Sequence, residues 1–227
     1  MKRLSIDRQG IGVIASIVYA VSGGVALAHN GCETIDNADY YYNYYVDICI
    51  KGSGLEAVTA CDKALDLRPK DVVVWTNRGV QLANLGEYEA AIDSYNRALD
   101  FDSDYSLAWV NRCADQIALG RYIEALSSCR NALDGDGRWG ELGEDYVWYN
   151  LGVAQEGLER YDNAGLSYQR ALELNPENAA AWNGLGYALE RSGRYEEALN
   201  AYERAVNLAP NVDTYRSNLE IVLQRLR

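Results

Sequence analysis

The sequence predicts an all-α protein, a solenoid of five helix-turn-helix repeats followed by a C-terminal capping helix. Tryptophan recurs at spacings of 34, 39 and 34 residues, at Trp75, Trp109, Trp148 and Trp182. When each unit is numbered so that these tryptophans fall at position 4, alanine fills positions 20 and 27 of all five units, and every proline lies at position 32. This period is typical of stacked helical hairpins, because neither helix of a unit can bury its apolar stripe alone.

Each unit is predicted to be two antiparallel helices joined by a tight turn. In the fifth unit, Trp182, Leu185 and Leu189 recur at helical spacing in the first helix. Glycine at position 15 of four units ends the first helix, and proline at position 32 ends the second. The segments are residues 1–28 and 29–37 ahead of the repeats, units at 38–71, 72–105, 106–139, 145–178 and 179–212, an inserted loop at 140–144, and the capping helix at 213–227.

The first segment has the pattern of a secretory signal peptide. A basic start precedes an apolar stretch at 11–21, and Ala26 and Ala28 have the spacing that a signal peptidase reads. We therefore expect export to a periplasmic, luminal or extracellular location after this segment is removed. The alternative is an uncleaved membrane anchor at 11–28, which is at the short end for a spanning helix. Only in that case do we expect a membrane partner.

The third unit departs from the period near its end. Gly135 stands where the other units have leucine or phenylalanine, so we expect the second helix to stop early. Asp134, Asp136 and Asp145 match places 1, 3 and 12 of a calcium loop, but Trp139 occupies the sixth place, where the turn needs glycine. We therefore expect a solvated insertion without metal, with Trp139 either exposed as a contact residue or folded back onto the solenoid.

These landmarks resemble those of the tetratricopeptide repeat (TPR) over residues 38–212. The fifth unit matches the family pattern almost completely, at Trp182, Leu185, Gly186, Tyr195, Ala198, Tyr202, Ala205 and Pro210. The first unit departs most, with Tyr45 in place of the usual glycine and Gly54 in place of an aromatic residue. The resemblance implies a right-handed TPR superhelical solenoid, with an inner groove lined by positions 2, 5, 6, 9, 12 and 13 of each first helix.

Composition narrows the range of functions. The 227 residues include 21 Lys and Arg against 33 Asp and Glu, a net charge of −12, so we expect no nucleic-acid partner. The single histidine, His29, excludes mechanisms and metal sites built on paired imidazoles. Since the sequence has no recognisable nucleophile–base pair, phosphate loop or Cys-x-x-Cys motif, we expect no catalysis and no cofactor.

Export would place the five cysteines in a compartment where disulfides can form. Cys113 and Cys129, at positions 8 and 24 of the third unit, lie level on the two helices if the turn is centred near position 16, which predicts a disulfide. The alternative is two small buried thiols. Cys49 and Cys61, at positions 12 and 24, are about one helical turn out of step and form a less favoured pair. Cys32 could bond to either of them.

Position 6 holds an asparagine ladder. Its members are Asn43, Asn77, Asn111 and Asn150, and Gly184 breaks it in the fifth unit. A carboxamide can donate to one peptide carbonyl and accept from one amide, so the ladder suits the backbone of an extended polypeptide. The alternative is that asparagine is common at this position of the repeat and is partly structural.

Around the ladder, the inner face is predicted to be mostly apolar in units one to three and polar and aromatic in units four and five. The other predicted peptide contacts are Tyr42, Val46, Val73, Thr76, Val80, Val110, Tyr149, Asn183 and Tyr187. An exposed apolar patch usually marks an interaction site. It could equally be covered by residues 29–37 or by a second copy of the chain, so self-association is also possible.

Tyrosines crowd the start of the first unit. We expect Tyr41, Tyr44 and Tyr45 on the packed side of the first helix, and Tyr40 and Tyr42 more exposed.

The sequence as a whole predicts a non-catalytic, exported scaffold or adaptor that binds an extended peptide or partner helix in the inner groove. The alternative is a carrier that holds a lipid or small hydrophobic ligand in the apolar groove of repeats 1–3.

Overall fold

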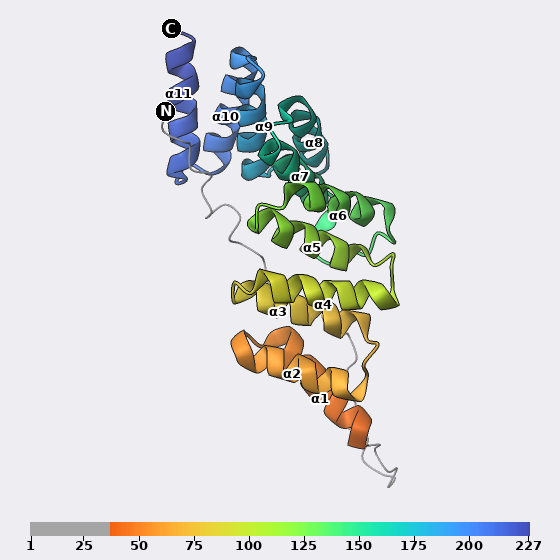
Figure 1. Cartoon of the computed structure of the whole chain (residues 1–227). Helices are drawn as coiled ribbons and strands as arrows, with labels where there is room; N and C mark the ends of the chain where they lie inside the picture. The colour runs from red at the N-terminus through yellow and green to blue at the C-terminus, as the bar shows by residue number, and fades with distance from the viewer. Residues whose placement is uncertain (1–36) are drawn as a thin grey trace.

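The computed structural model describes residues 37–227, which form an elongated, curved stack of helices without strands (Figure 1). The first helices of the five units are α1 (Asn37–Lys51), α3 (Val72–Asn84), α5 (Ser106–Ala118), α7 (Gly143–Gly157) and α9 (Ala179–Arg191). The second helices are α2 (Gly54–Leu67), α4 (Tyr88–Phe101), α6 (Tyr122–Asp134), α8 (Tyr161–Leu174) and α10 (Tyr195–Leu208), and α11 (Asp213–Arg225) follows. The expected signal peptide, His29 and Cys32 lie outside the described residues.

The stack has an inner and an outer layer. Every helix packs against its neighbours in sequence, and each first helix also contacts the first helix of the next unit, as α3 contacts α5. No two second helices of the described chain contact each other. The first helices are therefore the more closely spaced layer and line the inside of the curve. The predicted all-α TPR solenoid is confirmed.

Small side chains allow the two helices of each unit to approach closely. The alanines at positions 20 and 27 are fully buried in all five units: Ala57, Ala91, Ala125, Ala164 and Ala198 at position 20, and Ala64, Ala98, Ala132, Ala171 and Ala205 at position 27. A larger side chain at these places would force the helices apart, because protein interiors are close-packed.

The tryptophans at position 4 tie consecutive units together. The indole Nε1 of Trp75 donates to the carbonyl of Pro69 at 2.9 Å, and that of Trp182 donates to the carbonyl of Pro176 at 2.8 Å. In the capping helix, Arg216 takes the same place and donates to the carbonyl of Pro210 at 2.8 Å. The two landmarks of the repeat, tryptophan and proline, are thus partners across the turn between units.

The joint between units three and four is ordered. Helix α6 ends at Asp134, one residue earlier in the register than the other second helices, in agreement with the expected early stop. Helix α7 begins at Gly143, so the last two residues of the segment expected as an inserted loop are helical. The backbone N–H of Asp136 donates to the carbonyl of Asp104 at 2.8 Å, and Arg138 pairs with Asp102 at 2.5 Å. These bonds fasten the loop to the preceding turn.

The hydrophobic core continues across this joint. One cluster includes Leu126 and Ala132 of α6 together with Val147 and Leu151 of α7. Trp139 packs against the same cluster, so it folds back onto the solenoid. The stack therefore does not break at the glycine-rich segment.

Candidate functional site

The asparagine ladder is oriented by its own helices. The side-chain amide of Asn77 donates to the carbonyl of Val73 at 2.8 Å, and that of Asn111 donates to the carbonyl of Leu107 at 2.9 Å. These two side chains are 7% and 9% exposed. Each retains one N–H and its carbonyl oxygen without a further partner among the described residues. A structural role in its own helix thus uses one amide hydrogen of each asparagine. The second amide N–H and the side-chain carbonyl oxygen remain available to a ligand.

The other rungs differ from these two. Asn43 is exposed on α1, whereas Asn150 is buried and its nitrogen has no hydrogen-bond partner among the described residues. Asn218 of α11 lies 34 residues beyond Gly184 and continues the register, with its amide donating to Asn183 at 2.9 Å. The sequence-based numbering of the repeats ended with the fifth unit, so Asn218 in the capping helix was not predicted as a member of the ladder.

Gly184 breaks the ladder for a packing reason. A Cβ at Gly184 would lie 2.6 Å from the ring of Tyr168, and one at Gly152 would lie 2.7 Å from the same ring. The tyrosine is therefore held between two glycines, which leaves no room for asparagine in the fifth unit.

Three of the predicted contact residues outside the asparagine ladder lie in the core. Val110 is fully buried and Thr76 is 1% exposed; Tyr42 is 7% exposed, as Asn77 is, but its hydroxyl is already bonded to Asp71. The reason is the close packing of consecutive first helices, which covers side chains that point between them. The expected exposure of these three residues was wrong. The remaining apolar candidates, Val46, Val73 and Val80, are half-buried.

The tyrosines of α1 are distributed differently from the expectation. Tyr42 turns inward, its hydroxyl donates to the Asp71 carboxylate, and the Arg68 guanidinium lies 3.8 Å from its ring centre. Burial, together with the hydrogen bond to Asp71, raises the pKa of Tyr42 to about 12. Tyr41 and Tyr44 are about half exposed, contrary to the prediction. Asp71 caps α3, so its fixed carboxylate determines which tyrosine faces inward.

The inner face of units four and five is polar and aromatic. Tyr149, Asn183 and Tyr187 are half-buried there. The guanidinium of Arg191 donates to the Tyr187 hydroxyl at 2.9 Å and lies 4.6 Å from the ring centre of Tyr161.

A carboxylic acid and a tyrosine bridge the two helices in these units. The Tyr168 hydroxyl donates to Glu156 at 2.8 Å, and the Tyr202 hydroxyl donates to Glu190 at 3.0 Å. These residues occupy positions 24 and 12. Burial raises the pKa of Glu156 to about 7, although the Tyr168 hydroxyl acts in the opposite direction.

Disulfide bonds link the two helices of units one and three, also through position 24. Cys49 and Cys61, at positions 12 and 24, are joined with an S–S distance of 2.13 Å, and Cys113 and Cys129, at positions 8 and 24, with one of 2.08 Å. Positions 8 and 12 lie one turn apart on the same side of the first helix, and position 24 reaches both. The sequence made the Cys49–Cys61 disulfide the less favoured pair because position 24 was expected to face position 8 alone.

A further buried acid, missed by the sequence analysis, lies in the third unit. Asp115 is 2% exposed, and one of its carboxyl oxygens has no hydrogen-bond partner among the described residues. Burial raises its pKa to about 8, while a hydrogen bond with Tyr95 acts in the opposite direction. The available signal was an aspartate at position 10, where units four and five have alanine.

No cluster of three His, Cys, Asp or Glu side chains suited to a metal occurs within residues 37–227. Of the calcium-loop candidates, Asp136 pairs with Arg138 and Asp145 accepts from the Asn175 amide at 2.9 Å. None of the described helices has the length and apolar character needed to cross a bilayer.

Known proteins share this arrangement. Tetratricopeptide repeat family models match residues 72–105 and 149–213. The uncharacterized protein MJ0572 of Methanocaldococcus jannaschii is 37% identical over 59 residues, which cover 26% of this chain and 69% of that protein.

Solved structures extend the comparison to most of the stack. MamA from Desulfovibrio magneticus RS-1 is 22% identical, with 78% of this chain and 98% of that chain covered and a TM-score of 0.67. YrrB, described as a TPR protein with an unusual peptide-binding site, is 25% identical, with 74% and 84% covered and a TM-score of 0.62. Fold and repeats together define a helical-repeat solenoid. Tetratricopeptide repeats are present in this chain over residues 72–105 and 149–213.

Proposed function

We propose that this chain is a non-catalytic scaffold that binds an extended polypeptide along its inner face. The observation that carries the proposal is the matched pair Asn77 and Asn111. Both amides are held in the same way by their own helices, and each retains a donor and an acceptor. Groups oriented before binding lose less conformational entropy when a ligand arrives.

The charge of the inner face favours an uncharged ligand segment. In units two to five its lining positions carry three charged residues, Glu156, Glu190 and Arg191. Glu190 is paired with Arg225 at 3.1 Å, and Glu156 has a pKa near neutrality. The proposed contacts, besides Asn77 and Asn111, are Asn43, Asn150, Val46, Val73, Val80, Tyr149, Asn183 and Tyr187. YrrB, which is described as peptide-binding, supports the same use of this fold.

We also propose that the protein acts outside the cytoplasm. Two cysteine pairs lie at disulfide distance, and such bonds persist in oxidising compartments. The carrier alternative gains no support from the fold, because Val110 and Tyr42, which were to line its apolar groove, are packed inside the solenoid.

The test is a peptide-binding measurement on a paired variant. A peptide selected from a random library on the wild-type protein is titrated into the wild type, into N77A/N111A and into N200A, a control on the outer helix α10. We expect the double variant to bind about 5- to 100-fold more weakly, since each lost backbone contact costs about 0.5–1.5 kcal/mol. N200A should bind like the wild type. Equal affinity of all three proteins, with unchanged melting temperatures, would overturn the proposal.

A further inference from the structure

The outer side of the fourth unit lacks a side chain that the other units have. Position 21 is occupied by Val58, Ile92 and Leu126 in units one to three, and these residues are 6–8% exposed. The fifth unit has Leu199 there, partly buried. In the fourth unit the residue is Gly165, in the middle of α8.

The missing side chain leaves a small hollow between α8 and α9. Leu166, Leu185, Ala188 and Leu189 form its apolar part, Asp162, Gln169, Ser192 and Arg194 also line it, and its volume is about 30 Å³. A Cβ at Gly165 would meet only one atom within 4 Å, the Leu185 Cδ1 at 3.9 Å. Neighbouring atoms therefore do not require glycine here, and glycine inside a helix is less stable than alanine.

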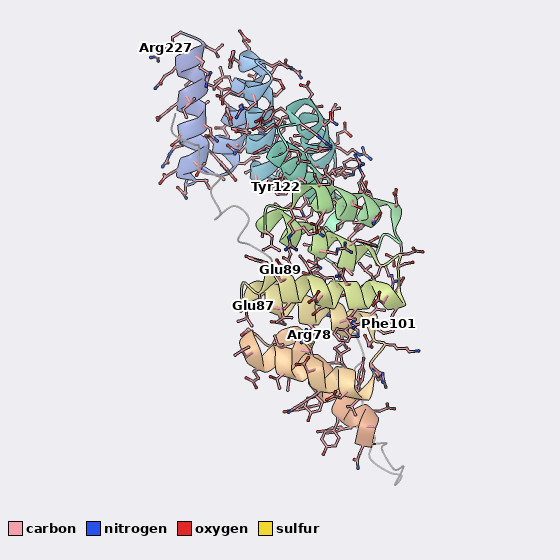
Figure 2. All side chains as sticks on the ribbon, in the orientation of Figure 1. Arg78, Glu87, Glu89, Phe101, Tyr122 and Arg227 are labelled. Atoms are coloured by element: carbon pink, nitrogen blue, oxygen red, sulfur yellow. A yellow bond between two sulfur atoms is a disulfide. The ribbon has the colours of Figure 1, made fainter. Side chains whose placement is uncertain are left out.

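Exposed aliphatic side chains lie on the same outer face. Ile123 on α6 is 72% exposed and Leu166 on α8 is 67% exposed. They occupy positions 18 and 22, which are one turn apart and so share a side of the second helices. In α4 and α10 these two positions hold Glu89, Asp93, Glu196 and Asn200. Figure 2 labels Glu89 and Tyr122, the neighbour of Ile123, near the same edge of the stack.

We propose that a second copy of the chain docks on this face, with Ile123 of each copy seated in the hollow beside Gly165 of the other. A two-fold interface must be self-complementary, because the same patch serves both copies. This patch contains both halves of such a contact: a protruding isoleucine on unit three and a partly apolar hollow on unit four. The hollow lies where the other units place an aliphatic side chain at position 21.

The test is sedimentation equilibrium of the full chain over a wide concentration range. The wild type is expected to show a monomer–dimer equilibrium. G165L fills the hollow from within the copy itself, and I123S removes the protruding group. Each should raise the dimer dissociation constant at least tenfold. L55S is the matched control, because Leu55 has the same position in unit one and the same 72% exposure.

Each result of the sedimentation experiment either supports or overturns the proposed dimer. A wild type that stays monomeric throughout, or one that grows without limit into larger assemblies, overturns the proposal. An equal effect of L55S and I123S also overturns it, because the contact would then lie elsewhere. L166S, which changes the apolar part of the hollow, replaces G165L if the leucine variant does not fold. Since the inner groove is untouched, I123S and G165L should bind the selected peptide as tightly as the wild type does.

Discussion

Asp115 is a buried carboxyl group and Glu156 a half-buried one, and folding favours the protonated form of both. Their pKa values are raised from 3.8 to about 8 and from 4.5 to about 7, chiefly by burial. A raised folded-state pKa gives a stabilising contribution that is complete below the unfolded value and is lost as pH rises through the folded value. We predict that the free energy of unfolding falls by roughly 1 kcal/mol per pH unit for each group, between about pH 5 and pH 7 for Glu156 and up to about pH 8 for Asp115.

Urea denaturation at several pH values measures this dependence. D115N should remove a large part of it, because the amide keeps the shape of the side chain without an ionisable proton. D93N, at an exposed carboxylate of α4, is the control and should keep the wild-type slope. A stability profile that is flat over this range would contradict the assignment.

Arg112 lacks an ion pair that the equivalent arginine of the second unit makes. In the second unit, Arg78 Nε donates to Asp62 at 2.6 Å. Arg112 lies 34 residues later, and its buried Nε has no partner among the described residues. The place equivalent to Asp62 is held by Asn96.

We therefore predict that N96D stabilises the protein by about 1 kcal/mol, because it supplies a charged acceptor to an unpaired buried donor. A thermal melt measures the change, and D62N should move the melting temperature downward. A lower melting temperature for N96D would show that Arg112 is oriented differently from Arg78.

Which residues reach the surface was only partly visible in the sequence. The 34-residue register gave Asn77 and Asn111 equivalent places, and both amides donate to the carbonyl four residues earlier. It could not show that Thr76 and Val110 are covered, since that depends on how closely consecutive first helices approach. That distance is set by contacts between units, which a period within one unit does not contain.

At the scale of elements, the turn of the fourth unit is strained. Glu159 has φ 58° and is the only residue other than glycine with positive φ in the described chain. The same place, position 15, holds Gly86, Gly120 and Gly193 in other units, with φ of 83°, 73° and 79°. A residue with a Cβ pays about 1–2 kcal/mol in this conformation.

We predict that E159G raises the free energy of unfolding by about 1 kcal/mol, measured by urea denaturation. G193A makes the reverse change in the fifth unit and should lower it by a similar amount. An unstable E159G would mean that the Glu159 side chain makes a contact worth more than the backbone strain.

Helix order and most helix ends could be predicted, but the joint between units three and four could not be predicted in full. Gly135 indicated that α6 would stop early, which it does. Helix α7 starts at Gly143, two residues ahead of the expected unit, and Glu144 in this extension accepts from the Trp148 indole at 2.9 Å. A local glycine-rich sequence gives no sign of such a bond.

At the scale of the whole molecule, the layered contacts explain why binding is assigned to the inner side. First helices touch one another and second helices do not, so the helices that carry the asparagines lie on the inside of the curve. The apolar core runs through the joint, so this face continues from unit three to unit four. The lining of this inner face changes along the stack: half-buried valines lie in units one and two, and tyrosines lie in units four and five.

Site-specific photo-cross-linking tests the inner-face assignment most directly. A photoreactive phenylalanine analogue is placed at Val80 or Tyr187 on the inner face, or at Asp93 on the outer face, in cells that produce the protein. We predict that the two inner positions cross-link to a polypeptide and that Asp93 does not. Cross-links from Asp93 alone, with none from Val80 or Tyr187, would contradict the account.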